Sequence, residues 1–367
     1  MSSPGPAPLH PPLPAGFPEP LDLAEYRAEL AGADATKGAD AAVILPGPVQ
    51  VRPGIWVLPQ PMPAEYPPHF TLSYLVHDTD GALHLIDPGW DSDENHERLA
   101  RLFAQIGASL GDLATILVTH LHPDHIGMAD RLRRESGARI ALHRLEQEAL
   151  LERVRSAGPA PDAAAGRATP FAEWGVPPER IGELDAVAAR LNGDSAASTP
   201  PVRADLLLEH DQLIDLPGHP LRVLLTPGHT RGHVCLVHER QRIVFTGDTL
   251  LPAMFPGIGL GGPAADPIGD YLRSLELLEG YGGYEVFPGH GYRFADPVGR
   301  IETTRRHHLR RSDEIAAIVR EHPDAPVWQI ASEVTWTAGW HNLSGFYLFS
   351  ALAQTAMHVQ YLRASAG

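Results

Sequence analysis

The chain has 367 residues, 43% of them hydrophobic, which is enough for one large globular domain with a smaller appendage. Its formal net charge of −16 at pH 7 argues against a general affinity for nucleic acid or for an anionic membrane surface. A single cysteine, Cys235, excludes an internal disulfide framework and a cysteine-rich metal site.

The N-terminal region, residues 1–48, opens with a tract rich in proline and alanine that we expect to be extended, because proline removes backbone donors and fixes φ. This region lacks the charged and apolar parts of a signal peptide. No stretch of the chain reaches the roughly 18 consecutive apolar residues of a membrane-spanning helix. We therefore expect a cytoplasmic protein without a membrane partner.

The folded part is predicted to begin at Val49 with four strands separated by Pro-Gly and Asp-Gly turn sequences. These strands are expected at residues 49–52, 55–58, 71–76 and 83–86. The last strand ends at Asp87, whose carboxylate could cap the amphipathic helix predicted over residues 93–106. Strands and helices then alternate, which is typical of α/β packing. The strands are expected at residues 114–118 and 139–142, and the helices at 126–136 and 144–154.

A cluster of side chains that can ligate metal follows the strand at residues 114–118. From Thr119 the sequence reads Thr-His-Leu-His-Pro-Asp-His. His120 and His122 alternate with period two and point the same way in extended backbone, whereas the proline turns the chain and presents Asp124 and His125 from another direction. Each half of the cluster is short of the three or four protein ligands of a zinc site. The cluster therefore predicts two half-sites whose other ligands lie further along the chain.

Three further candidate ligands each follow an apolar run and stand beside a glycine. They are His229 in Pro-Gly-His-Thr, Asp248 in Thr-Gly-Asp-Thr and His290 in Pro-Gly-His-Gly. Imidazole and carboxylate ligands suit zinc, iron or manganese. The runs themselves predict strands at residues 221–225, 234–238, 242–245 and 284–287, with a helix at 271–278 that Asp270 could cap.

In their order and placement at strand ends, these motifs resemble those of metallo-β-lactamase-fold hydrolases of the glyoxalase II and lactamase-like thioesterase or nuclease type. The resemblance covers about residues 45 to 295. It implies an α/β fold of four layers, arranged αβ/βα. It also implies two divalent metal ions, with zinc expected ahead of iron or manganese.

The same resemblance implies a role for each motif residue. One ion is held by the residues matching His120, His122 and His229, and the other by those matching Asp124, His125 and His290. The carboxylate matching Asp248 bridges the two ions. The acid matching Asp87 lies near the ions and supports ligand imidazoles. The counterpart of His233 is not a ligand.

Such a pair of ions implies hydrolysis by a shared hydroxide that attacks a carbonyl, without a protein nucleophile. Asp124 is the expected catalytic residue, which orients the hydroxide and passes a proton to the leaving group. The expected substrate is a small carboxylic ester or thioester, since a thiolate needs little help to leave. Two alternatives stay open: a non-haem iron persulfide dioxygenase and a metal-dependent nuclease of the same fold.

The composition divides the chain into regions around the predicted metallo-β-lactamase-fold domain, residues 49–298. Residues 155–201 are rich in Ala, Pro and Gly, with helical patterns at 169–174 and 178–191. They predict a helical cap over the active-site cleft, with a mobile linker as the alternative. Residues 299–367 predict a helical, winged-helix-like module, which we expect to pack against the domain and not to read nucleic acid.

A basic helix predicted at residues 301–321 supplies candidate substrate contacts. Arg306 and Arg310 lie one helical turn apart, and arginine binds phosphate or carboxylate in two-point fashion. The partner expected here is a small molecule, such as an anionic thioester. The alternative is that nearby acids such as Glu302 neutralise these arginines as ordinary surface ion pairs. Self-association into a homo-oligomer stays open.

Overall fold

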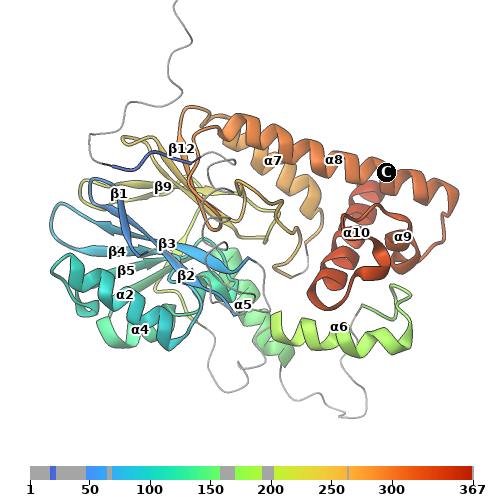
Figure 1. The fold of residues 1–367 in the computed structure, drawn as a ribbon, viewed down its shortest axis with the longest axis horizontal. Coiled ribbons are helices and arrows are strands. Elements are labelled where there is room, and N and C mark those ends of the chain that lie inside the picture. Colours follow the sequence, from blue (N-terminus) through green and yellow to red (C-terminus); the bar gives the residue numbers. More distant parts are fainter. Residues whose placement is uncertain are drawn as a thin grey trace, which may run out of the picture.

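The computed structural model describes residues 17–21, 47–63, 68–157, 170–191, 202–262 and 264–365. Most of the predicted N-terminal extension, and residues 158–169 and 192–201 of the predicted insertion, lie outside this part of the chain. Two β-sheets lie face to face, and helices cover the outer side of each (Figure 1). The four-layer α/β architecture expected from the sequence is confirmed.

Within the described residues, the first sheet has seven strands in sequence order. They are β1 (Val49–Arg52), β2 (Ile55–Pro61), β3 (Phe70–His77), β4 (Leu83–Ile86), β5 (Leu113–Leu117), β6 (Arg139–His143) and β7 (Leu206–Leu208). Strands β1 to β4 pair antiparallel, and β4 to β7 pair parallel.

The second sheet has five strands in the described part of the chain. In spatial order they are β12 (Glu285–Pro288), β11 (Ile243–Gly247), β10 (Val234–His238), β9 (Leu221–Leu225) and β8 (Leu213–Ile214). Only β11 and β12 pair parallel among them. Strands β7 and β8 were not predicted, because three and two residues are too few for a strand-like pattern to be recognised.

Apolar side chains from the inner faces of both sheets form the central core. The Tyr74 ring of β3 lies 5.2 Å from the Phe245 ring of β11 and 5.3 Å from the Phe287 ring of β12. Its hydroxyl donates to the Pro288 carbonyl at 2.7 Å. This contact fixes the end of β12 against the first sheet, directly before His290.

Helices α2 (Asp93–Gln105) and α4 (Ala129–Ser136) pack on the outer face of the first sheet. Helices α7 (Pro267–Glu279) and α8 (Pro297–Glu321) pack on the outer face of the second. The other helices are α3 (Pro123–Ile126), α5 (Arg144–Ala157), α6 (Pro178–Leu191), α9 (Val327–Glu333) and α10 (Gly345–Ser365), with 3-10 turns at Leu110–Asp112 and Trp340–Asn342.

Three helix predictions are wrong in their details. The helix expected over residues 126–136 is split into α3 and α4 at Gly127, where an added Cβ would lie 2.3 Å from the Pro123 carbonyl oxygen. Helix α7 begins at Pro267, with Asp266 as its N-cap in place of Asp270, because proline suits the first helical turn. Residues 170–175 form turns instead of the helix expected at 169–174.

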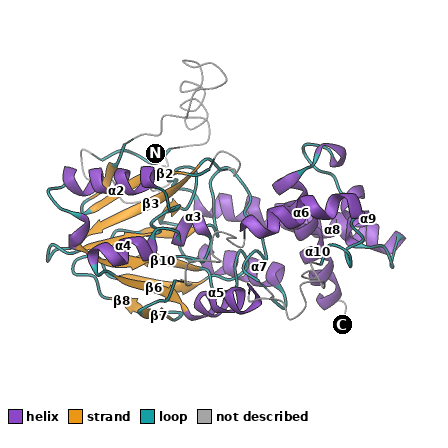
Figure 2. Ribbon diagram, turned by 90° about the horizontal axis from the view of Figure 1, so that it is seen from below, coloured by secondary structure: helices purple, strands orange, loops and turns teal. Residues whose placement is uncertain are grey.

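Helix α6 lies beside α9 and α10 at one end of the molecule (Figure 2). A shared apolar cluster contains Phe171, Val176 and Leu184 from the inserted segment and Leu348 and Leu352 from α10. Strands are absent from the described residues 297–365, so this part of the chain contains no β-wing. The domain boundaries at residues 48, 155, 201 and 298 stay predictions. None of the described helices combines the length and apolar character needed to cross a membrane.

Candidate metal centre

All seven residues predicted to hold metal come together at one edge of the two sheets. Five of them are reached from strand ends: His120 and His122 after β5, His229 after β9, Asp248 after β11 and His290 after β12. Asp124 and His125 lie on α3, a helix of a single turn that directs both side chains towards the other candidate ligands. In each of three overlapping groups, the candidate ligand atoms lie within 4.8 Å of one another.

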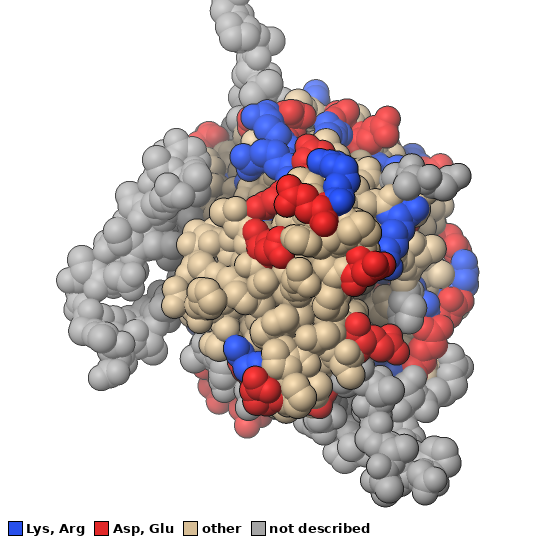
Figure 3. Space-filling model, turned by 90° about the vertical axis from the view of Figure 1, so that its right-hand side faces the viewer, with Lys and Arg blue, Asp and Glu red and all other residues tan. Residues whose placement is uncertain are grey.

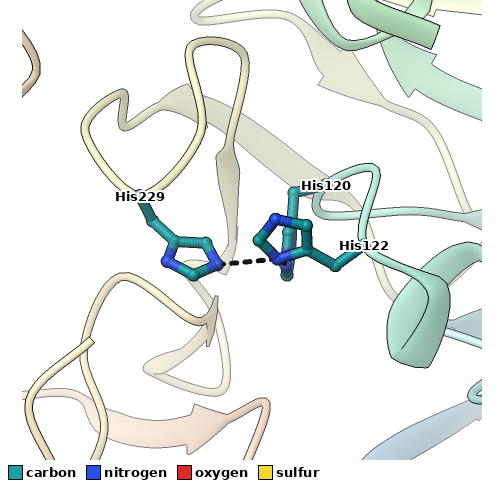
Figure 4. A group of neighbouring side chains, drawn as sticks. All are labelled: His120, His122 and His229. Carbon is teal, nitrogen blue, oxygen red and sulfur yellow. Dashed lines mark hydrogen bonds between the residues drawn. The ribbon is translucent and has the colours of Figure 1, made fainter. Parts of the chain in front are cut away.

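The first group consists of three imidazoles, His120, His122 and His229 (Figure 4). The Nδ1 atom of His122 lies 3.0 Å from Nε2 of His120 and 3.0 Å from Nε2 of His229. Nitrogen ligands at about 2.0–2.1 Å from a tetrahedral zinc ion lie roughly 3.3–3.4 Å apart. The three nitrogens are therefore spaced for one ion.

The second group consists of Asp124, His125 and His290. The Asp124 Oδ2 atom lies 3.3 Å from Nε2 of His125 and 3.2 Å from Nε2 of His290. Asp248 stands between the two groups: its carboxylate lies 3.5 Å from Nε2 of His125, 3.4 Å from that of His290 and 3.5 Å from that of His229. One carboxylate thus faces both groups.

Every imidazole in the two groups also has its other ring nitrogen beside an oxygen acceptor. The pairs are His120 with Thr119 Oγ1 at 3.0 Å, His122 with Leu260 O at 3.3 Å, His125 with Asp87 Oδ2 at 2.9 Å, His229 with Gly257 O at 2.6 Å and His290 with Phe70 O at 2.8 Å. Each acceptor favours the tautomer that carries its proton on the outer nitrogen. The inner nitrogens are then left as lone-pair donors that all face one small region.

Asp87 connects the two groups. One carboxylate oxygen accepts the Thr119 backbone N–H at 2.8 Å, and the other accepts the Thr119 hydroxyl at 2.8 Å and the His125 ring N–H at 2.9 Å. The helix that follows is capped by Ser92, whose hydroxyl accepts the Asn95 N–H. The capping interpretation of Asp87 is therefore wrong, and its carboxylate is committed to the ligand loop.

Two buried atoms indicate what kind of group belongs in the site. Nε2 of His125 and Oδ1 of Asp248 have no hydrogen-bond partner in the described part of the chain. A Cβ at Gly289 would lie 2.5 Å from that same oxygen and 2.8 Å from a carbon of the His125 ring, so the backbone closes tightly over the site. Buried polar atoms are rarely left unsatisfied, and a divalent cation would engage both atoms. The residues present fit a metal ion.

The electrostatics of the two groups differ. Burial lowers the pKa of His120 well below its usual value and that of His122 to about 3, so these rings are neutral, as a metal ligand must be. Burial also acts on His290, but the neighbouring Asp248 and Asp124 carboxylates outweigh it and raise its pKa to about 10. The second group therefore attracts positive charge.

His233 is not directed at the cluster. Its Nε2 atom accepts the Asp248 backbone N–H at 3.0 Å, and its Nδ1 lies 2.9 Å from the Thr249 hydroxyl. It holds the backbone of Asp248 and leaves the carboxylate directed inward. Cys235 is buried in β10, and burial raises the pKa of its thiol to about 12, which agrees with an inert strand residue.

Several contributing groups were not found from the sequence. The carbonyls of Gly257 and Leu260 carry no side-chain signal, and their loop was not assigned a role. Glu146 of α5 accepts the Leu121 N–H at 2.8 Å and the Gly232 N–H at 2.7 Å, which ties the His-x-His segment to the loop after His229. In the sequence it cannot be distinguished from a surface acid of an amphipathic helix.

Arg306 and Arg310 of α8 form no hydrogen bond or ion pair with this cluster among the described residues. Arg306 is exposed and pairs with Glu302 at 3.0 Å, and Arg310 is also exposed. On the side of the molecule that carries α8 and α10, basic and acidic side chains are interspersed and a broad area carries neither (Figure 3). A role for Arg306 and Arg310 in substrate binding stays a prediction.

Two sheets with outer helices and buried His/Asp groups define a metal-binding protein of the metallo-β-lactamase fold. Residues 66–290 match the family model described as "Metallo-beta-lactamase superfamily". The match covers more than half of the chain, and the chain belongs to this superfamily.

Relatives of known sequence carry related names. The chain is 29% identical to "Atrochrysone carboxyl ACP thioesterase AacuM" of Aspergillus aculeatus over 38% of this chain and 43% of that protein. It is 27% identical to "Beta-lactamase-like protein 2 homolog" of Caenorhabditis elegans over 34% of this chain and 39% of that protein. These matches span less than half of either relative. "Probable metallo-hydrolase YqjP" of Bacillus subtilis is 26% identical over 77% of this chain and 85% of its own length.

Solved structures agree with the fold. A metallo-beta-lactamase family protein from Thermus thermophilus superimposes with a TM-score of 0.68 at 28% identity, covering 86% of this chain and 94% of that one. A beta-lactamase domain protein from Burkholderia ambifaria superimposes with a TM-score of 0.70 at 23% identity, covering 89% and 92%. Both comparisons extend beyond the residues that the family model matches.

Proposed function

We propose that this protein is a dinuclear metal-dependent hydrolase that cleaves a small carboxylic ester or thioester. The observation that carries the proposal is the position of Asp248, whose carboxylate lies within 3.5 Å of imidazole nitrogens in both groups. A single anion between two ligand sets is suited to neutralise two neighbouring cations. The superfamily and the relatives named as a thioesterase and a metallo-hydrolase support the same reaction class.

In this proposal the two groups each hold one divalent ion. His120, His122 and His229 would hold the first ion, and Asp124, His125 and His290 the second, while the Asp248 carboxylate faces both groups. The chemistry supplied by such ions, when bound, would be an activated water, with a pKa towards about 7, and polarisation of a carbonyl. We expect zinc ahead of iron or manganese from the imidazole and carboxylate donors.

Asp124 is the residue that handles the proton. It is buried at the second group, and the Thr71 hydroxyl donates to its Oδ2 atom at 3.3 Å, which limits its rotation. We propose that its carboxylate orients the attacking water and transfers a proton to the leaving group. A thiolate leaves without that proton and an alkoxide does not, so thioesters are the least demanding substrates for such a site.

The test combines metal analysis with a substrate panel. The purified protein should contain about two equivalents of divalent metal by elemental analysis, and should hydrolyse members of a panel of thioesters, esters and lactones. Chelation should abolish that activity, and zinc should restore it. A protein that contains a single iron and consumes oxygen with a persulfide substrate, or that cleaves only RNA, would contradict the proposal.

A further inference from the structure

Arg153 of α5 lies beside the group formed by His120, His122 and His229. Its Nη2 atom donates to the Leu260 carbonyl at 3.3 Å. The same carbonyl oxygen accepts the ring N–H of His122, also at 3.3 Å. The guanidinium and this imidazole are therefore neighbours across a single oxygen atom, and the arginine is partly buried.

Among the described residues, Arg153 forms no ion pair. The nearby arginines of the same region do: Arg144 pairs with Glu148 at 2.8 Å, and Arg231 pairs with Glu152 at 3.0 Å. Glu146 exerts an electrostatic effect on Arg153, but its two carboxylate oxygens already accept backbone N–H groups. Among the described residues, Arg153 thus has no carboxylate in direct contact, and the buried Glu146 acts on its charge only from a longer distance.

A guanidinium has five N–H donors, and only one of those on Arg153 has an acceptor among the described residues. Removing a charged donor from water without a partner is unfavourable. A ligand that brings an anion to this position would supply the missing partner, and the planar fork of arginine matches carboxylate and phosphate oxygens. The backbone N–H of Leu260 donates to the His229 carbonyl at 2.9 Å, which positions Leu260. The Leu260 carbonyl in turn positions the guanidinium group of Arg153.

We propose that Arg153 binds an anionic group of the substrate, a carboxylate or a phosphate, beside the first metal position. This inference deepens the proposed function and rests on it. It places the specificity for charge on α5, at a residue that shares the Leu260 carbonyl with His122. A substrate that spans the site would present its reacting carbonyl to the metal groups and its anion to Arg153.

The experiment measures selectivity in Arg153→Gln and Arg153→Lys variants. The substrates are thioesters with one common acyl group and thiol parts that carry a carboxylate, a phosphate or no charge. In Arg153→Gln the ratio of kcat/KM for the preferred anionic substrate to that for the neutral one should fall about 10- to 100-fold, mainly through KM. Arg153→Lys should recover part of the ratio, because it keeps the charge and loses the fork. The two anionic substrates show which anion is bound.

Arg134→Gln is the matched control, since it removes the same charge from an exposed position on α4 that pairs with Asp130. It should leave the selectivity ratio and the metal content as in the unaltered protein. A second measurement uses the unaltered protein alone: KM for the anionic substrate should rise with ionic strength, and KM for the neutral one should not.

An unchanged ratio in Arg153→Gln, equal losses on charged and neutral substrates, or a salt-independent KM would each overturn the inference about Arg153. The proposed function would stand in these cases, because the unaltered protein would still bind metal and hydrolyse the neutral thioester. Failure of the unaltered protein to hydrolyse any member of the panel would overturn both.

Discussion

At the scale of single residues, Asp87 links the two ligand groups through three hydrogen bonds of its carboxylate. It fixes Thr119, and through that hydroxyl His120 of the first group, and it directly fixes His125 of the second. Its backbone is in the left-handed region, with φ of 52°, which a non-glycine residue rarely adopts. Such strain is retained where the surrounding contacts require that position.

The first prediction concerns Asp87→Ala. Without the carboxylate, His125 and Thr119 lose their acceptor, and the affinity of the site for zinc should fall about 10- to 100-fold. Competition with a chromogenic chelator measures this affinity. Asp91→Ala, an exposed acid four residues later, should bind zinc as the unaltered protein does. Equal affinities in the two variants would contradict the role given to Asp87.

The second prediction concerns Asp248→Ala. The substitution removes a carboxylate that faces both groups, so two bound ions would repel each other more strongly. We expect metal content to fall from about two equivalents towards one, and hydrolysis to fall with it. Elemental analysis after gel filtration provides the count. Two retained equivalents with full activity would rule out the shared role of this carboxylate.

The third prediction separates ligand and proton roles at Asp124. Asp124→Asn keeps the size of the side chain and removes the charge. If the carboxylate transfers a proton, hydrolysis of an alkyl ester should decline at least about tenfold more than hydrolysis of a thioester with the same acyl group. The slope of log kcat against leaving-group pKa measures the difference. Parallel losses on both substrates would leave Asp124 with a ligand role alone.

The chemistry of the cluster was predictable because its residues are coded as short motifs at strand ends. Sequence indicates which side chains meet when a strand end brings them to a shared edge, as it does for His120, His229 and His290. It did not indicate Gly257 or Leu260, whose contribution is a carbonyl that any residue supplies. It also missed Glu146 and Arg153, because a helix with mixed charges gives no sign of which charged side chain turns inward.

At the scale of elements, the loop after β11 depends on helix α8. Arg300 donates to the carbonyls of Leu251 and Met254, and its guanidinium lies 4.7 Å from the centre of the Phe255 ring. The same loop continues to Gly257 and Leu260, whose carbonyls hold His229 and His122. The orientation of two imidazoles therefore depends on a contact with the helix that begins at Pro297.

The fourth prediction follows from this dependence. Arg300→Met keeps much of the side-chain length but removes the donors to the loop, so His122 and His229 should lose part of their fixed orientation. We expect zinc affinity to fall about tenfold with little change in the folded content seen by circular dichroism. Arg320→Met, at an exposed position on the same helix, is the control. Unchanged zinc affinity in Arg300→Met would show that the loop holds its shape without α8.

Element boundaries show where local patterns stop being informative. The apolar runs predicted β9 and β10 at their observed bounds, since buried strands are rich in apolar residues. Helix α4 starts three residues later than expected because Gly127 packs against the Asp91 backbone N–H and the Gly89 carbonyl, a contact with the β4–α2 connection. Tertiary packing of that kind leaves no periodic trace in the sequence.

At the scale of the whole molecule, the histidines outside the metal groups include several that are buried and neutral. His238 of β10 is fully buried, and its Nε2 lies 3.2 Å from Nδ1 of His219. Burial, with smaller contributions from His219 and Arg240, lowers the pKa of His238 to about 4. His238 is therefore harder to protonate in the folded protein than in the unfolded chain, where the pKa of histidine is about 6.5.

The fifth prediction is a consequence for stability in acid. Since the folded pKa of His238 is depressed, its effect on stability is constant above about pH 6.5, and stability declines as the pH falls from there to about 4. The urea midpoint should therefore drop between pH 7 and pH 5 by less in His238→Gln than in the unaltered protein. Elemental analysis at each pH checks that both proteins hold the same amount of metal, so that the difference between them reports on this residue. An identical decrease of the urea midpoint in the two proteins would show that folding does not lower the pKa of His238.

The inserted residues 170–191 and the C-terminal helices share one apolar cluster and are joined by backbone contacts. The Trp328 N–H donates to the Trp174 carbonyl at 2.8 Å, and Arg180 donates to the Leu343 carbonyl at 3.2 Å. Phe171 and Leu184 are almost fully buried in this cluster. The two segments thus bury part of their apolar faces against each other.

Because residues 170–191 and α10 form one apolar cluster, this cluster can form only after both segments have left the ribosome. The inserted segment emerges roughly 150 residues before α10, which at about 5–20 residues per second is an interval of about 8–30 s. In the last part of that interval, after β12 has been synthesised and before α10 has, both sheets have all their described strands while Phe171, Val176 and Leu184 still have no partner from α10. The nascent protein thus passes through a stage in which the two sheets are complete and the apolar face of α6 is still exposed. We expect chaperone binding to be strongest at this stage.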